Sequence, residues 1–296
     1  MASQVAQEVH QLAAIPTMRR RMLGAQLRRI RERQQLTADE VATRMKWHPS
    51  KMSRIEAGRS GLRAHEVGGL LDLYEVWDPS TRDALEVLAK EGKRRVWWQP
   101  YNDVLTPRYL DYICLEADAS AALSFETTLI PGLLQTPDYA RAVIRALKPE
   151  RETDEVNALV EVRLARQNAA LNREEPLQLW VIVDESALHR EVGGASAFNR
   201  QLKRLRDAAE QPDITLQILP FGAGAHAGML GPFVIFEFPV QADLDVVYSE
   251  GLASSVYLER DADRIAYRRT FDLLRAAALD VGPSHDMIER RIGEQT

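Results

Sequence analysis

The chain has 296 residues, a length that suggests about two domains. Hydrophobic residues make up 45% of it and charged residues 27%, which is typical of a globular protein and excludes a mostly disordered one. No apolar run approaches the roughly 18 residues of a membrane-spanning helix, and the N-terminus lacks a signal-peptide core. We therefore expect a cytoplasmic protein with no membrane partner.

Charge is distributed unevenly along the chain, although its net value is only −5. Residues 1–63 hold 13 Lys and Arg against 5 Asp and Glu, a balance of +8, and the remaining residues have a balance of −13. Contacts to phosphates supply most of the nonspecific affinity for nucleic acid. A basic headpiece on an acidic body is therefore typical of a nucleic-acid binder.

The first segment of the chain divides at Pro16. Residues 1–16 are weakly amphipathic and form an N-terminal arm, either a frayed segment or a small docking helix. Residues 17–35 predict an arginine-rich helix, although such a face is most often simply solvated. Phosphate contacts are expected from three of its side chains: Gln26, Arg28 and Arg29.

Residues 36–58 predict two short helices joined by a tight turn. Thr37, with Glu40 three residues later, forms a capping box at the start of the first helix. Pro49 suits the first turn of the second helix, residues 49–57, because its missing N–H would be unsatisfied there in any case.

The second of these helices combines a thin apolar stripe, Met52 and Ile55, with a polar and cationic outer face. A plain helical hairpin is the alternative to a functional motif. A DNA major groove accepts a helix of this width and offers hydrogen-bond acceptors to Arg and Lys. Base contacts are therefore expected from the outer face: Ser50, Lys51, Ser53 and Arg54.

The sequence Ser53-Arg54-Ile55-Glu56-Ala57-Gly58 resembles the second helix of the motif in the Xre or Cro-repressor-like helix-turn-helix family. The resemblance implies a structural pair between Arg31 and Glu56. Ala38 and Pro49 depart from the family pattern, and neither side chain can hydrogen-bond a base. Further phosphate contacts are expected from Thr37, Lys46 and Arg59.

Two more helices, at residues 62–76 and about 79–90, complete the predicted headpiece. It is an all-α, five-helix, repressor-like DNA-binding domain at residues 17–92. Residues 93–96 form the expected linker to a second domain.

We expect residues 97–296 to form a larger α+β domain. This domain would bind an effector or interact with a partner, and it would make the dimer contact. Helices are expected at residues 107–121, 152–172, 197–210, 262–279 and 284–292, with another that starts at Thr136-Pro137-Asp138. Strands are expected at residues 123–130, 177–184, 214–219, 233–238, 246–250 and 255–259. Because runs of strands are followed by helices, we expect an α+β layer and not a doubly wound sheet.

The segment from Pro131 to Tyr139, PGLLQTPDY, is similar to part of the uncharacterised C-terminal domain of antitoxin-like bacterial regulators. Trp97-Trp98 and Leu115-Glu116-Ala117-Asp118-Ala119 also fit that pattern, which covers most of residues 97–292. The resemblance implies DNA binding, frequent association with a small partner protein and no established chemistry.

Candidates for chemistry are weak, and we expect no enzyme, no catalytic residue, no cofactor and no metal. The loop at residues 221–228 is rich in glycine but lacks the Lys and Ser or Thr of a phosphate loop, so a flexible connection or a lid is favoured. Asp184-Glu185 is more often a cap than a catalytic pair. The single cysteine, Cys114, is expected to be a buried structural thiol. The histidines of residues 97–296 are scattered singly: His189, His226 and His285.

One aromatic group is a candidate effector pocket, although a packed core seam is the commoner explanation. Its members are Trp97, Trp98, Tyr101, Tyr109 and Tyr112.

Together these features predict a sequence-specific regulator that binds double-stranded DNA through the helix at residues 49–57. Dimers of such headpieces read two half-sites about one helical turn apart, so we expect a homodimer. The C-terminal domain has two further candidate partners. In an antitoxin-like alternative it binds a small protein, with DNA binding for autoregulation, and in the other it binds a small-molecule effector.

Overall fold

The computed structural model describes residues 18–89, 97–101, 103–238, 245–252 and 254–294. They form two compact units, an N-terminal unit at residues 18–89 and a C-terminal unit made of the described residues from 97 on. The expected arm at residues 1–16 and linker at 93–96 lie outside the described residues. No helix in the described part is both long and apolar enough to cross a bilayer.

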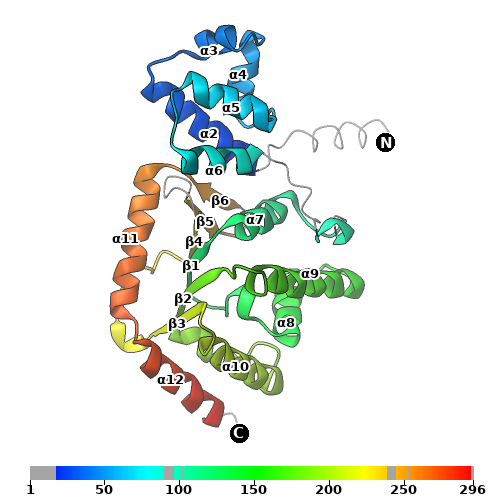
Figure 1. Ribbon diagram of the computed structural model, residues 1–296. Coiled ribbons are helices and arrows are strands. Elements are labelled where there is room, and N and C mark those ends of the chain that lie inside the picture. Colours follow the sequence, from blue (N-terminus) through cyan, green and yellow to red (C-terminus); the bar gives the residue numbers. More distant parts are fainter. Residues whose placement is uncertain (1–17, 90–96, 102, 239–244, 253, 295–296) are drawn as a thin grey trace. The chain divides into compact units, whose positions relative to one another are not determined.

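The N-terminal unit is a helical bundle, as Figure 1 shows. Its helices are α2 (Met18–Arg33), α3 (Ala38–Arg44), α4 (Pro49–Glu56), α5 (Ala64–Leu73) and α6 (Pro79–Ala89). Helix α2 packs against α4 and α6, α3 packs against α4, and α5 packs against α6. The core is formed by fully buried side chains, among them Leu27, Val41, Met52, Ile55, Val67, Leu70, Leu71 and Tyr74.

The turn between α3 and α4 is closed by backbone hydrogen bonds at the end of α3. Lys46 lies in the left-handed region at φ 56°, where glycine is the usual residue. Its N–H donates to the carbonyl of Thr43, and the N–H of Trp47 donates to that of Ala42 at 2.8 Å. His48 then caps α4, because its ring accepts a hydrogen bond from the N–H of Ser50.

Helix α4 ends in the same way, with glycine in the left-handed position. Gly58 has φ 70°, and its N–H donates to the carbonyl of Ile55. The N–H of Arg59 donates to the carbonyl of Arg54, also at 2.8 Å. These two bonds define a Schellman end, so the helix stops where the sequence predicts.

Helices α2 and α4 approach each other closely at Gly24. A Cβ atom at Gly24 would clash with the carbonyl oxygen of Ile55 and lie 2.8 Å from that of Glu56. Gly24 therefore allows the backbone of α2 to contact the last turn of α4 directly.

The C-terminal unit contains a mixed six-stranded sheet with the strand order β3-β2-β1-β4-β5-β6. The strands are β1 (Ala121–Glu126), β2 (Gln178–Asp184), β3 (Ile214–Leu219), β4 (Phe233–Glu237), β5 (Val246–Glu250) and β6 (Ser255–Leu258). Strands β1, β2 and β3 pair in parallel, and β4, β5 and β6 extend the sheet by antiparallel pairing. The expected α+β domain is thus confirmed as a mixed sheet with helices.

The expectation of an α+β layer did not include the parallel pairing of half of the sheet. Parallel neighbours require crossover connections, which are usually helical. The chain crosses from β1 to β2 through α8 (Pro137–Leu147) and α9 (Thr153–Leu171), and from β2 to β3 through α10 (Ala195–Ala209).

Helices cover both faces of the sheet. Helix α11 (Asp261–Ala277) lies on one face, and α7 (Pro107–Asp118), α8, α9 and α10 lie on the other (Figure 1). The α11 side holds an apolar core in which Phe271 and Leu274 pack on Leu123, Phe125 and other strand residues. Helix α12 (Val281–Glu294) packs against α10 and β3.

The PGLLQT segment forms a buried elbow between β1 and α8. Gln135 donates to the carbonyl of Ile130 at 2.7 Å, and Gln167 donates to the carbonyls of Gly132 and Gln135, both at 2.8 Å. The amide of Gln201 donates to the carbonyl of Leu134 and accepts from the N–H of Thr136. Side chains from α9 and α10 thus satisfy backbone groups that no regular element pairs.

Replacing Gly24 by Ala should lower the free energy of unfolding of the N-terminal unit by about 1–3 kcal/mol, because the new methyl group overpacks the contact with α4. Gly68→Ala is the matched control within a helix, since its Cβ would lie 3.9 Å from the nearest neighbouring atom. It should be neutral or stabilising by up to about 1 kcal/mol. Urea denaturation of the two variants measures the difference, and equal stabilities would contradict the close approach.

Candidate nucleic-acid interface

An ion pair between Arg31 of α2 and Glu56 of α4 fixes α4 to the bundle. The Nε and Nη2 atoms of Arg31 donate to the two carboxylate oxygens of Glu56 at 2.6 and 3.0 Å, and Nη1 donates to the carbonyl of Leu36 at 2.6 Å. The hydrogen bond to Glu56 raises the pKa of Arg31, so the guanidinium stays charged. The side chains are only 11% and 9% exposed. This two-pronged geometry restrains both the position and the rotation of α4.

The outer face of α4 is exposed where the sequence predicts base contacts. Ser50, Ser53 and Arg54 are exposed, whereas Met52 and Ile55 are buried beneath them. The Oγ atom of Ser50 lies 2.9 Å from a ring nitrogen of its neighbour His48. Within the described part of the chain, no carboxylate lies within ion-pair distance of Arg54. Its donors are therefore accessible to a ligand.

Lys51 differs from the other three expected base contacts. Its Nζ atom lies 2.6 Å from a carboxylate oxygen of Glu66 and 3.9 Å from the centre of the Trp47 ring. The side chain is 26% exposed and points to α5 instead of away from the bundle. In this structure Lys51 is engaged within the protein, so the expected base contact by Lys51 does not fit its geometry.

The expected phosphate contacts near α3 and α4 are all exposed. They are Thr37, Lys46 and Arg59. The hydroxyl of Thr37 donates to Glu40 and accepts from its N–H, and the Thr37 N–H donates to the same carboxylate. These bonds lower the pKa of Glu40 and complete the capping box.

The expected phosphate contacts on α2 fit less well. Gln26 is buried at 7% exposure, on the face of α2 that carries Leu23 and Leu27, so we correct its assignment to an interior residue. Arg28 is exposed but donates to Glu32 at 2.8 Å, one helical turn away. Arg29 is half-buried.

The aromatic group expected to line an effector pocket packs instead as a core seam. Trp97, Trp98, Tyr101 and Tyr109 contact a cluster of Leu105, Ile113 and Val162. Tyr112 lies edge-on to Phe236 and Tyr248, with ring centres 5.2 and 4.7 Å apart. Cys114, on the same helix, is partly buried.

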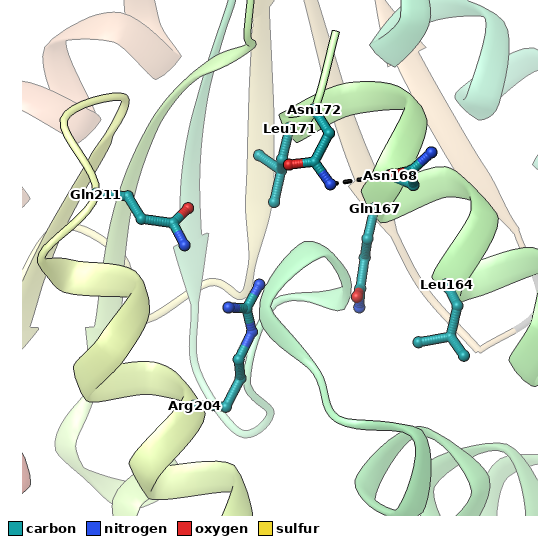
Figure 2. A pocket seen from close by; sticks show the side chains of 7 residues that line it. All are labelled: Leu164, Gln167, Asn168, Leu171, Asn172, Arg204 and Gln211. Carbon is teal, nitrogen blue, oxygen red and sulfur yellow. Dashed lines mark hydrogen bonds between the residues drawn. The ribbon is translucent and has the colours of Figure 1, made fainter.

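A pocket of about 250 Å³ lies instead between α9 and α10 (Figure 2). It is lined by Leu164, Gln167, Asn168, Leu171, Asn172, Arg204 and Gln211. Most of these side chains are polar, and Asn172 donates to Asn168, one helical turn before it, at 3.0 Å. Such a lining does not suit an apolar ligand.

The other sequence candidates for chemistry have structural partners. Asp184 accepts from the N–H of Ser186 as a cap, and Glu185 accepts from the N–H of Phe221 at 2.7 Å. A Cβ at Gly228, in the glycine-rich loop, would clash with Phe125. Among the residues that the structure describes, no group of three or more His, Cys, Asp or Glu side chains is arranged to hold a metal ion.

Buried charged side chains lie between α7, α9 and the end of β1, a group that the sequence did not indicate although Tyr109 beside it belongs to the expected effector pocket. Arg166 forms an ion pair with Glu116 at 2.9 Å and donates to the hydroxyl of Tyr109 at the same distance. Nearby, burial raises the pKa of Glu126 to about 7. The hydrogen bond from Ser124 and the charge of Arg166 oppose this shift, and the charge of Glu250 adds to it.

Glu56→Ala should destabilise the N-terminal unit by about 3 kcal/mol, because it leaves the buried charge of Arg31 without a partner. Glu32→Ala removes the exposed pair with Arg28, whose side chains are 62% and 52% exposed, and should change stability far less than Glu56→Ala does. Chemical denaturation measures both. A small effect of Glu56→Ala would show that Arg31 finds water or another acceptor.

Stability of the C-terminal unit should fall as pH rises from about 4.5 to 7, because Glu126 retains its proton longer in the folded state than its ordinary pKa of 4.5 allows. Glu126→Gln keeps the shape but cannot ionise, so it should remove about 2 kcal/mol of this loss. Denaturation of the wild type and the variant at pH 5 and pH 7.5 tests this expectation. Parallel pH profiles would contradict it.

Two family models match the chain. Residues 22–85 match a family described as Helix-turn-helix domain, and residues 109–290 match the Domain of unknown function (DUF5753). No curated protein and no solved structure matches the chain. The first match indicates DNA binding and the regulation of transcription. Because the second match covers more than half of the chain, the protein belongs to the DUF5753 family, with a helix-turn-helix domain ahead of that domain.

Proposed function

We propose that the protein is a sequence-specific regulator of the Xre or Cro-repressor-like type, which places α4 in the major groove of double-stranded DNA. The main support is the arrangement of α4. Met52 and Ile55 pack its buried side on the bundle. The ion pair between Arg31 and Glu56 restrains it, and Arg54 is exposed on the outer face. A recognition helix needs this combination of rigid attachment and accessible donors.

Within this proposal, Arg54 reads a base and the neighbouring groups position the helix. A guanidinium suits the two acceptors of guanine, O6 and N7. Ser50 lies one helical turn before Arg54 on the same face, and Ser53 is adjacent. Lys46 and Arg59 contact phosphates on either side, consistent with the balance of +8 over residues 1–63.

We further propose that the protein is a non-catalytic homodimer and that the C-terminal unit makes the dimer contact. Dimeric headpieces of this kind read two half-sites about one helical turn apart. Several large apolar side chains of the C-terminal unit are exposed and available for association, including Leu230, Leu252 and Ile265. The selected DNA should therefore contain an inverted repeat.

Selection from a pool of randomised duplexes, followed by binding measurements, tests the proposal. Arg54→Ala should weaken binding to the selected duplex by about 1–3 kcal/mol and relax the preference at one position of each half-site, because a base contact is lost. Lys46→Gln should weaken binding to all duplexes alike. If Arg54→Ala weakened every duplex equally, its base-reading role would be withdrawn, and a wild-type chain that ignored duplex at low ionic strength would refute DNA binding.

A further inference from the structure

Lys51 and Glu66 connect the proposed recognition helix to the helix after it. The Nζ atom of Lys51 on α4 donates to Glu66 on α5 at 2.6 Å, and the two side chains are 26% and 19% exposed. The same ammonium group lies 3.9 Å from the centre of the Trp47 ring, in the turn before α4. A carboxylate and an aromatic face thus satisfy one cation at the edge of α4.

The position of Lys51 on α4 explains this direction. Each helical residue advances by about 100°, so Lys51 lies between exposed Arg54 and buried Ile55. Ser50 and Arg54, four residues apart, share the centre of the outer face. Lys51 therefore lies at the border of that face, where a long side chain can reach either DNA or the bundle.

Glu66 has two roles in this arrangement. One carboxylate oxygen accepts from Lys51, and the other accepts from the N–H of Arg63 at 2.9 Å as part of the cap of α5. Burial raises the pKa of Glu66, but the hydrogen bonds from Arg63 and Lys51 outweigh it and the net shift is downward. Glu66 therefore stays charged and in place near neutral pH.

We propose that Glu66 holds Lys51 away from DNA, so that Lys51 is a positioning residue that ties α4 to α5 and Glu66 limits the sequence-independent affinity of the headpiece. This inference rests on the proposed DNA binding. A phosphate group would have to displace a carboxylate at 2.6 Å and withdraw the ammonium from the Trp47 ring. The helix then contacts DNA with one cation fewer than its sequence suggests.

Glu66→Gln isolates the charge, because a glutamine can still accept the Arg63 N–H in the cap. Once released, Lys51 can neutralise one phosphate. The logarithm of the affinity for an unrelated duplex should then fall more steeply with the logarithm of salt concentration, by about 0.9 in slope. Between 200 and 50 mM salt the variant should gain about three- to fourfold more affinity than the wild type.

Lys51→Met supplies the matched measurement. In the wild-type background it should leave the salt slope unchanged, and in the Glu66→Gln background it should abolish the extra slope. Melting temperatures of all four proteins show that each is folded.

Three results would overturn the inference. The first is a salt slope that Glu66→Gln does not change. The second is a wild-type Lys51→Met protein that loses about 0.9 in slope or its preference at one base position, since Lys51 would then contact DNA directly. In both cases the wild type still binds duplex, and the proposed function survives. The third is a wild type that binds no duplex at low ionic strength, which removes both proposals together.

Discussion

The N-terminal unit depends on the ion pair between Arg31 and Glu56. Helix α4 buries only Met52 and Ile55 deeply, and two apolar side chains do not define the rotation of a helix. The bidentate contact adds a fixed direction, because a planar guanidinium and a planar carboxylate must lie nearly in one plane. A buried pair of this kind contributes little net stability. Its value here is geometric, since a rotation of α4 would change the direction in which Arg54 points.

Because α4 buries so few side chains, contacts of its backbone are important in holding it. The helix is only eight residues long, and both of its ends are fixed by hydrogen bonds outside its own turns. Gly24 lets α2 touch its last carbonyl groups, and Gly58 lets the chain reverse directly after them. Short helices are marginal alone, so neighbouring contacts must hold them. Because these contacts hold α4, its exposed side chains can contact a ligand without also being needed for folding.

Much of this could be predicted from the sequence, because caps and periodicity are local. Thr37 with Glu40, Pro49 and Gly58 mark helix ends through chemistry that acts within one turn. The Arg31–Glu56 contact, in turn, was implied by the resemblance to a known family. The direction of a side chain at the border of a helix face could not be predicted. Lys51 is a cationic residue of the kind that contacts DNA, and only the position of Glu66, 15 residues later, directs it inward. The phosphate contact expected of Gln26 fails for the same reason, since a polar residue beside Leu27 can lie inside when the bundle supplies partners.

The parallel half of the sheet was also missed, because strand direction depends on crossovers that no short pattern encodes.

In the C-terminal unit, the side chains around the elbow from Ile130 to Tyr139 have structural roles that follow from the backbone of this segment. The chain leaves β1 at the centre of the sheet and turns into α8 beside α9 and α10, with Ile130, Leu133 and Leu134 buried. Its carbonyl groups then need donors, and Gln167 and Gln201 supply them from two different helices. Arg166 approaches so closely that a Cβ at Gly132 would lie 2.6 Å from its Nη2 atom. Glycine, glutamine and proline in this segment follow from backbone hydrogen bonding and close packing. The motif therefore accounts for the path of the chain between β1 and α8.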